Sequence, residues 1–267
     1  MNRLDGKVAL ISGGARGIGG ETARLMASVG ARVVVGDVLE DAGRRTVEAI
    51  TGAGGDALFV PLDVTTEAGW KAALDAARAR YGRLDVLVNN AGIFLGRDFE
   101  EASLEDWSRL VAVNMTGVFL GTKLCAPDLR AAAATSPQGS AIVNLASIAG
   151  LVGSQLDALY SMTKGGVTLF TKSTALAFAR KGDRIRVNSV HPGVIDTDMG
   201  AQTFVSRARM AGSNDVGEAR QVSERFHPMG RLGTADDIAR AIVFLASDDS
   251  AFMTGSSMVV DGGVTAQ

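Results

Sequence analysis

Short apolar runs of strand length alternate with longer segments of helical period along the whole chain. The predicted strands are residues 7–12, 32–36, 57–62, 84–89, 140–145, 185–190 and 257–260. The predicted helices between them include residues 20–29, 41–51, 67–81 and 104–134. Strands separated by helices need crossover connections, which join parallel neighbours and place helices over both faces of the sheet. The pattern predicts an α/β protein with a doubly wound parallel sheet of about seven strands.

The chain of 267 residues shows no internal repeat and no linker rich in proline or serine, so we predict one domain over residues 1–267. One segment, residues 197–231, is polar and only weakly periodic. It follows a predicted strand at the edge of the sheet where open α/β folds bind ligands. We therefore predict that it forms a lid over a substrate.

Composition excludes several classes of function. Lysine and arginine number 27 against 29 acidic residues, so the net charge of −2 provides no basic field for nucleic acid or anionic membrane. We find no uncharged run long enough to span a bilayer and no signal peptide. The single cysteine, Cys125, cannot form an internal disulfide, which favours a reducing compartment, the cytoplasm. We expect Cys125 itself to be a small residue of the core. Two histidines and one cysteine are too few for a zinc site, and we predict no metal.

A glycine-rich segment, residues 12–19 (SGGARGIG), connects the first predicted strand to the first predicted helix. Glycines at 13, 17 and 19 permit backbone conformations and close approaches that a Cβ would block. A pyrophosphate can then lie against the free N–H groups at the helix N-terminus. With Asp37 at the end of the second strand, 20 positions after Gly17, this pattern indicates a dinucleotide site.

Tyr160 and Lys164 stand four residues apart, one above the other on a predicted helix. A phenol has a pKa of about 10, and a neighbouring ammonium favours its ionised form, which suits a proton acceptor. Ser147 follows a predicted strand, where its hydroxyl could hold a substrate oxygen. Asn114 lies within a helical stretch, where asparagine is a poor former, so its side chain or a local backbone irregularity has a role there.

Together these segments resemble the short-chain dehydrogenase/reductase family over essentially the whole chain. Asn89-Asn90-Ala91-Gly92 matches the family's NNAG segment, and Asp63-Val64 matches the pair that contacts adenine. Ser12 stands where threonine is usual, and Ala146 where a second serine is frequent. The resemblance implies a Rossmann-like fold, catalytic roles for Asn114, Ser147, Tyr160 and Lys164, and a water held at Asn114. The implied cofactor-binding residues are Gly13, Arg16, Gly17, Ile18, Gly19, Asp37, Asp63, Val64, Asn90, Ala91, Gly92, Val113, Tyr160, Lys164, Pro192, Gly193, Ile195 and Thr197.

Apolar residues near the predicted strand ends indicate a pocket for a neutral, bulky substrate. With Ser147 and Tyr160, the predicted substrate contacts are Phe94, Leu151, Leu156, Met199 and Phe204. The stretch 183–193 is similar to family members that oxidise hydroxysteroids or cyclic alcohols. We therefore expect a substrate of one of these classes. A 3-oxoacyl-thioester reductase using NADPH shares nearly all the motifs and stays the alternative. A catalytically silent nucleotide-binding sensor is a third possibility, disfavoured because Ser147, Tyr160 and Lys164 are all present.

Three further expectations concern the remaining charged residues, the cofactor and the assembly. His191 packs or hydrogen-bonds near a strand end, His227 lies on the surface of the lid, and the lid arginines 207, 209 and 225 are solvated charges. Asp37 at the ribose favours NAD over NADP, although Arg16 in the glycine segment argues for the phosphate. Long helices with more than one apolar face predict a homotetramer, with a dimer as the fallback.

Overall fold

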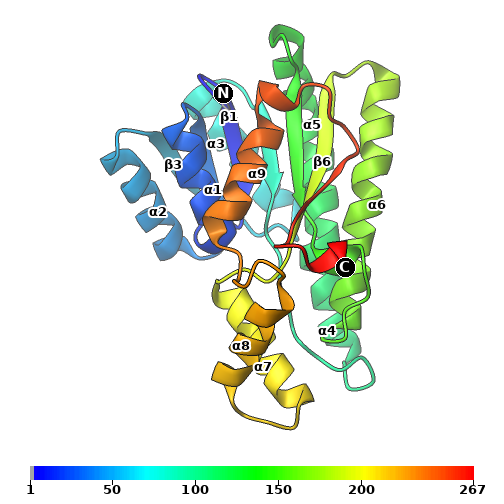
Figure 1. Ribbon diagram of the computed structural model, residues 1–267. Helices are drawn as coiled ribbons and strands as arrows, with labels where there is room; N and C mark the ends of the chain where they lie inside the picture. The colour runs from blue at the N-terminus through cyan, green and yellow to red at the C-terminus, as the bar shows by residue number, and fades with distance from the viewer. Residues whose placement is uncertain (1–2) are drawn as a thin grey trace.

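The computed structural model describes residues 3–267, and a single sheet of parallel strands forms its centre (Figure 1). The strand order is β3-β2-β1-β4-β5-β6-β7, as predicted for a doubly wound sheet. The strands are β1 (Val8–Ser12), β2 (Arg32–Asp37), β3 (Asp56–Pro61), β4 (Val86–Asn89), β5 (Ser140–Leu145), β6 (Ile185–Pro192) and β7 (Ser257–Val260). Strand β1 pairs with β2 on one side and with β4 on the other. The connections that follow β1 and β4 therefore run in opposite directions across the sheet, which leaves a crevice between these two strands at their carboxyl ends.

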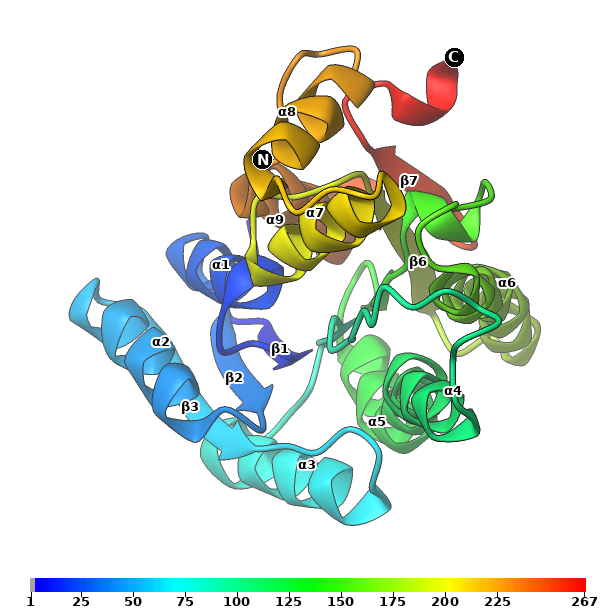
Figure 2. The ribbon, with the colours of Figure 1, turned by 90° about the horizontal axis from the view of Figure 1, so that it is seen from below.

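Helices cover both faces of the sheet (Figure 2). One face is covered by α1 (Gly17–Ser28), α2 (Glu40–Gly52) and α9 (Ala235–Ala246), and the other by α3 (Glu67–Tyr81), α5 (Gly117–Thr135) and α6 (Ala158–Lys181). Alternate residues of strand β1 pack against the helices on opposite faces of the sheet. Val8 and Leu10 pack into the core beneath α3, whereas Ala9 and Ile11 pack beneath α1 and α9. Side chains alternate along a strand, so a strand buried on both faces must be apolar at every position.

The predicted helix 104–134 forms as a continuous helical segment with one irregularity. It consists of α4 (Leu104–Val111), a π-helical turn η1 (Ala112–Thr116) and α5. The segment Leu104–Thr135 is long and apolar enough to cross a membrane by length and composition alone. Half of its apolar window is buried inside the protein, where Leu120, Cys125 and Leu129 pack into the core, so packing explains its apolar character.

Residues 197–231 fold into two short helices, α7 (Asp198–Met210) and α8 (Val216–Phe226), which project beyond the carboxyl ends of the strands (Figure 1). Thr197 and Asp215 cap their first turns. The pair has a small core of its own, built from Phe204, Ala208, Ala219 and Leu232. Weak periodicity is typical of such helices because a small core requires only a few apolar positions.

Candidate active site

The glycine segment lies in the crevice between β1 and β4, and backbone-to-side-chain hydrogen bonds connect it to β4. Asn90 Nδ2 donates to the carbonyl oxygens of Ser12 (3.0 Å) and Gly13 (2.9 Å). Ser12 Oγ accepts from the N–H groups of Asn90 (3.1 Å) and Ala91 (3.2 Å). A Cβ on Gly13 would lie 2.8 Å from the Ala91 Cα, and one on Gly19 would overlap the Gly13 carbonyl. Gly13 and Gly19 are therefore required by close packing of the backbone.

The N-terminus of α1 opens onto this crevice. Arg16, at the N-cap, makes no capping hydrogen bond with its side chain, and the first turn within the described residues contains no acidic side chain. The first N–H groups of α1 are thus available to an external acceptor, and the helix dipole favours an anion. This cradle, which a Cβ would fill, fits the pyrophosphate of a dinucleotide.

Asp37, at the end of β2, is buried and held in one orientation. Its carboxylate accepts hydrogen bonds from the N–H groups of Ala15 (2.9 Å) and Leu39 (3.0 Å). Arg16, the basic residue that argues for NADP, forms an ion pair with Asp198 at the start of α7. A fixed carboxylate thus stands where the sequence predicts the adenosine ribose, and Arg16 is already paired.

Tyr160 and Lys164 lie one turn apart near the start of α6, as predicted. Asp157 caps this helix: its Oδ1 accepts from the Tyr160 N–H (2.8 Å), and its Oδ2 accepts from the Gly96 N–H (3.0 Å) of the loop after β4. The Tyr160 ring packs edge-on against Phe94, with 5.4 Å between ring centroids. One buried carboxylate therefore orients both the catalytic helix and the loop that carries Phe94.

Burial dominates the electrostatics of this pair. It raises the pKa of Tyr160 to about 12, an effect that the hydrogen bond from Ser147 opposes. Burial also lowers the pKa of Lys164 to about 8. Lys164 Nζ donates to the Leu145 carbonyl (2.7 Å) and lies 5.5 Å from the centroid of the Tyr160 ring. In this structure the loss of solvation outweighs the lowering of the Tyr160 pKa that the sequence predicts from the lysine.

Asn114 lies in the π-helical turn η1 and is fully buried. Its Oδ1 accepts from the Ile93 N–H (2.8 Å), and its Nδ2 donates to the Ile93 carbonyl (2.9 Å) and to Thr163 Oγ1 (3.2 Å). The predicted backbone irregularity is thus the π turn, and the side chain connects it to α6 and to the loop after β4. π turns occur frequently at functional sites.

Ser147 follows β5 and is supported by His191. His191 is fully buried; its Nδ1 lies 2.9 Å from the Ser147 carbonyl oxygen and its Nε2 lies 2.8 Å from Ser189 Oγ. Burial lowers the pKa of His191, which favours a neutral ring. As expected, this histidine hydrogen-bonds at a strand end. Its support of the Ser147 backbone is a contact that sequence reasoning did not identify.

These elements surround one cavity of about 960 Å³. Ser147, Tyr160 and Lys164 line it, with all the predicted cofactor-binding residues and with Phe94, Leu156 and Met199. Asn114 lies behind the wall. The cavity also contacts residues the sequence did not identify, among them Arg109, Thr203, Arg207 and Phe226. Nothing in their local sequence distinguishes them, because they are brought here by the packing of α4, α7 and α8.

Four sequence-based expectations are wrong in this structure. Leu151 is exposed and does not line the cavity. Phe204 faces α8 instead of the cavity and is buried in the small core of the two helices. His227 is buried, not on the surface: its Nε2 accepts from the Val194 N–H (3.2 Å). Arg207 lines the cavity, whereas Arg209 and Arg225 are exposed as expected.

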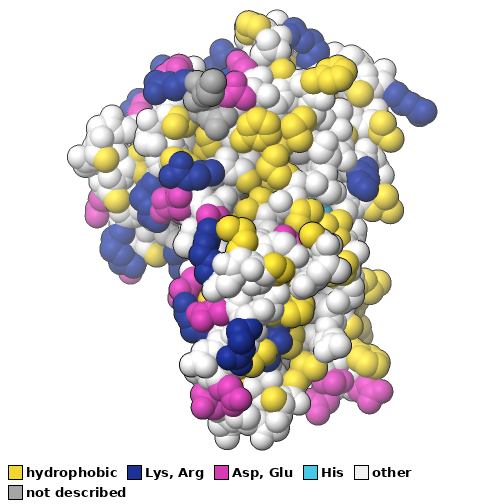
Figure 3. All heavy atoms as spheres, viewed as in Figure 1, with side chains coloured by type: hydrophobic (Ala, Val, Ile, Leu, Met, Phe, Trp, Pro, Cys, Tyr) yellow, Lys and Arg dark blue, Asp and Glu magenta, His cyan; other side chains and the backbone are white. Residues whose placement is uncertain are grey.

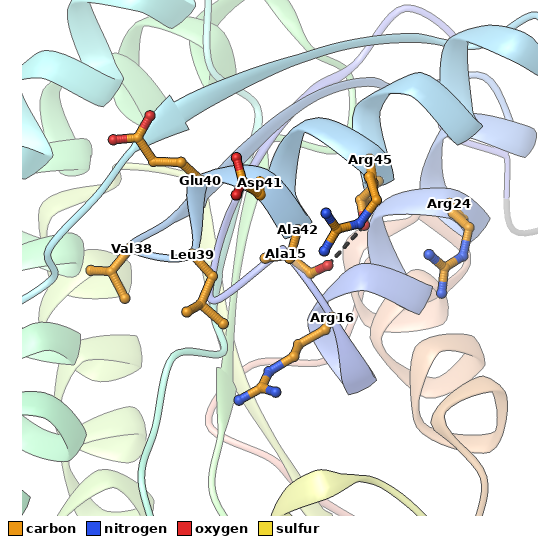
Figure 4. A pocket seen from close by; sticks show the side chains of 10 residues that line it. Ala15, Arg16, Arg24, Val38, Leu39, Glu40, Asp41, Ala42 and Arg45 are labelled. Atoms are coloured by element: carbon orange, nitrogen blue, oxygen red, sulfur yellow. Dashed lines mark hydrogen bonds between the residues drawn. The ribbon is translucent and has the colours of Figure 1, made fainter.

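A second, open hollow adjoins the cavity beside Asp37, between α1 and α2 (Figure 4). Arg16, Arg24 and Arg45 surround it together with Glu40 and Asp41. Arg24 forms an ion pair with Glu21. The charges around this hollow are therefore mixed, and the positive charges there are partly paired.

A parallel sheet with a glycine-rich crevice and a tyrosine–lysine pair beside it is the arrangement of a nicotinamide-dependent oxidoreductase. The model of the family described as enoyl-(acyl carrier protein) reductase matches residues 13–265. A crystal structure of a short-chain type dehydrogenase/reductase from Mycobacterium marinum superimposes with a TM-score of 0.88, at 33% identity, over 100% of this chain and 98% of that one. The chain belongs to the short-chain dehydrogenase/reductase family.

Two relatives have named activities. A trans-4-hydroxycyclohexanecarboxylate dehydrogenase from Sinomonas cyclohexanicum is 45% identical over 99% of this chain and 95% of its own length. A 3-alpha-(or 20-beta)-hydroxysteroid dehydrogenase from Mycobacterium tuberculosis is 41% identical over 99% of this chain and 91% of its own length. The first name describes an enzyme for a hydroxyl on a cyclohexane ring, and the second an enzyme for a hydroxyl on a steroid.

Proposed function

We propose that the protein is an NAD-dependent dehydrogenase that interconverts a cyclic secondary alcohol and its ketone. The observation that carries this proposal is that Ser147, Tyr160 and Lys164 line the same cavity as the glycine cradle. The names of the relatives, which act on cyclohexane and steroid alcohols, support a cyclic substrate. The cavity volume of about 960 Å³ leaves room for a ring beside the cofactor.

The proton path follows from the contacts of the three side chains. Ser147 holds the substrate oxygen by a hydrogen bond, and Tyr160 accepts the hydroxyl proton during oxidation and returns it during reduction. Bound NAD⁺ supplies the acceptor for the hydride that leaves the carbinol carbon. Lys164, with its ammonium 5.5 Å from the Tyr160 ring centroid, favours the ionised phenol.

Asp37 supports NAD as the cofactor. Its fixed carboxylate can accept hydrogen bonds from ribose hydroxyls and would repel a 2′-phosphate, while the ion pair with Asp198 engages Arg16. We expect Asp37→Ala to lower the ratio of kcat/KM for NAD⁺ to that for NADP⁺ by about tenfold or more. The variant removes the carboxylate that accepts hydrogen bonds from the ribose of NAD⁺, and it removes the repulsion of the 2′-phosphate of NADP⁺. Steady-state kinetics with both coenzymes test this. Asp75→Ala, at an exposed carboxylate of α3 that lines neither the cavity nor the hollow, is the matched control.

The helices α7 and α8 are proposed as the lid, because Met199, Thr203 and Phe226 form one wall of the cavity.

A homotetramer in the cytoplasm is proposed for the assembly. It is supported by exposed apolar side chains on α6, where Met162, Leu169 and Leu176 recur every seven residues. The described residues also leave Phe252 and Val259 exposed near the carboxyl end. Apolar side chains gather on that face, over α9 and β7 (Figure 3).

An assay of alcohols with NAD⁺, followed by the absorbance of reduced nicotinamide, tests the function. Cyclohexanol, cyclopentanol and a 3α-hydroxysteroid are expected to be oxidised with a higher kcat/KM than linear alcohols. The alternative is reduction of a 3-oxoacyl thioester with NADPH; the description of the matching family model shares the acyl carrier but names a different reaction, reduction of an enoyl double bond. Turnover of acetoacetyl thioester with NADPH, without oxidation of any cyclic alcohol, would replace the first proposal by the second.

A further inference from the structure

The wall that α7 contributes to the cavity contains one cationic side chain. Met199, Thr203 and Arg207 recur every four residues along α7 and all line the cavity. Residues at this spacing lie on one helix face. The adjacent face contains Phe204 and Ala208, which pack towards α8. The fold thus places Arg207 in the wall of the cavity, partly withdrawn from solvent.

Arg207 has no counter-charge within residues 3–267. Its guanidinium makes no hydrogen bond or ion pair there, and its Nε is buried without a partner. Its guanidinium carbon lies 5.8 Å from the centre of the Phe226 ring. Burial lowers the pKa of Arg207, as expected for a charge that has lost water and gained no acidic partner.

The acidic residues nearest in the cavity wall are already engaged. Asp196 accepts from both terminal nitrogens of Arg220 (3.0 and 2.7 Å), and Asp198 pairs with Arg16. Arg109, on α4, is another of the cationic side chains that line the same cavity. No carboxylate of the cavity wall described by the structure therefore forms an ion pair with Arg207.

A partly desolvated arginine without a partner is costly, because a buried charged donor without an acceptor loses the free energy of its hydration. Solvated arginines such as Arg209 and Arg225, both exposed, do not bear this cost. A ligand carboxylate would remove the cost at Arg207, since the planar guanidinium binds a carboxylate through two parallel hydrogen bonds.

We propose that the substrate of this enzyme carries a carboxylate, and that Arg207 of α7 binds it while Tyr160 of α6 receives the alcohol proton. This inference rests on the proposed function for the reaction and adds the chemical class of the substrate. The carboxylate and the carbinol contact different elements, so they stand at different ends of the substrate. A hydroxy acid built on a ring satisfies both contacts.

Kinetics with a matched pair of alcohols test the proposal. The probes are 4-hydroxycyclohexanecarboxylate and its neutral methyl ester. The native enzyme is expected to favour the carboxylate, and Arg207→Met to lower the carboxylate-to-ester ratio of kcat/KM by about 10- to 100-fold, the range for a hydrogen-bonded charged contact. Arg207→Lys should restore part of the ratio, because it keeps the charge. Arg209→Met, on the exposed side of α7, is the matched control and should leave the ratio unchanged.

A binding measurement separates this proposal from the proposed function. Titration of cyclohexanecarboxylate into the NAD⁺-saturated protein by calorimetry needs no turnover, and Arg207→Met should weaken the affinity by about tenfold or more. If no alcohol is oxidised but Arg207→Met binds cyclohexanecarboxylate more weakly, the proposed function is wrong and the anion site at Arg207 is supported. Equal preference for acid and ester in the native enzyme, or equal loss of both in Arg207→Met, would overturn the anion site.

Discussion

At the scale of single residues, the site depends on one phenol that can give and take a proton. Tyr160→Phe keeps the edge-on contact with Phe94 but removes that proton. We expect kcat to fall by about 10²- to 10⁴-fold, the usual contribution of a general acid or base. The dissociation constant for NAD⁺, measured by fluorescence, should change little. Activity close to that of the native enzyme would mean that another group transfers the proton.

The pH dependence also belongs to individual residues. Alcohol oxidation requires Tyr160 without its proton, and burial raises the pKa of this phenol to about 12. Oxidation should therefore speed up as the pH rises between about 6 and 9, whereas ketone reduction, which uses the protonated phenol, should change little over the same range.

Lys164→Ala removes the ammonium beside the phenol, whose pKa then rises further. The oxidation profile should move to higher pH, and cofactor binding should weaken as well. Profiles of kcat against pH for both directions check the sign. An unchanged pH profile in Lys164→Ala would show that the lysine does not influence the proton transfer.

At the scale of elements, the cap of α6 has an additional role. Asp157 receives one N–H from α6 and one from the loop at Gly96. Asp157→Ala should lower the free energy of unfolding by about 1–3 kcal/mol, through loss of the cap and of a buried acceptor. Asp157→Asn keeps one acceptor oxygen for only one of the two N–H groups, so it should fall between Asp157→Ala and the native protein. Urea unfolding at a fixed protein concentration measures both variants, and equal midpoints for all three proteins would contradict this role.

At the scale of the whole molecule, the stripe of Met162, Leu169 and Leu176 is expected to be covered by another copy of the chain. Light scattering of the native protein should give about four times the chain mass of 27.6 kDa. Leu169→Lys puts a charge in the middle of this stripe and should reduce the mass to that of a dimer or a monomer. Met210→Lys, an equally apolar exposed position at the end of α7, is the control. A native monomer at micromolar concentration would contradict the assembly.

The sequence by itself determined the parts of this protein that depend on local pattern. Alternating apolar runs and helical segments predict the parallel sheet, because burial on both faces leaves a period that can be recognised along the chain. The glycine segment and the Tyr160–Lys164 spacing indicate a dinucleotide and a proton acceptor, because each motif lies within one turn or one loop. Asn114 stands out in the sequence because asparagine is a poor helix former within a predicted helix.

Only the tertiary structure decided which face each residue of α7 and α8 presents. Phe204 and Arg207 are three residues apart, yet one enters the small core and the other lines the cavity. His227 is buried against the backbone of Val194, and Leu151 is turned away from the cavity. Weak periodicity left these orientations open, because the two helices bury a core of only a few side chains. The contacts that α7 and α8 make with each other and with the sheet edge are long-range, and no spacing along the chain encodes them.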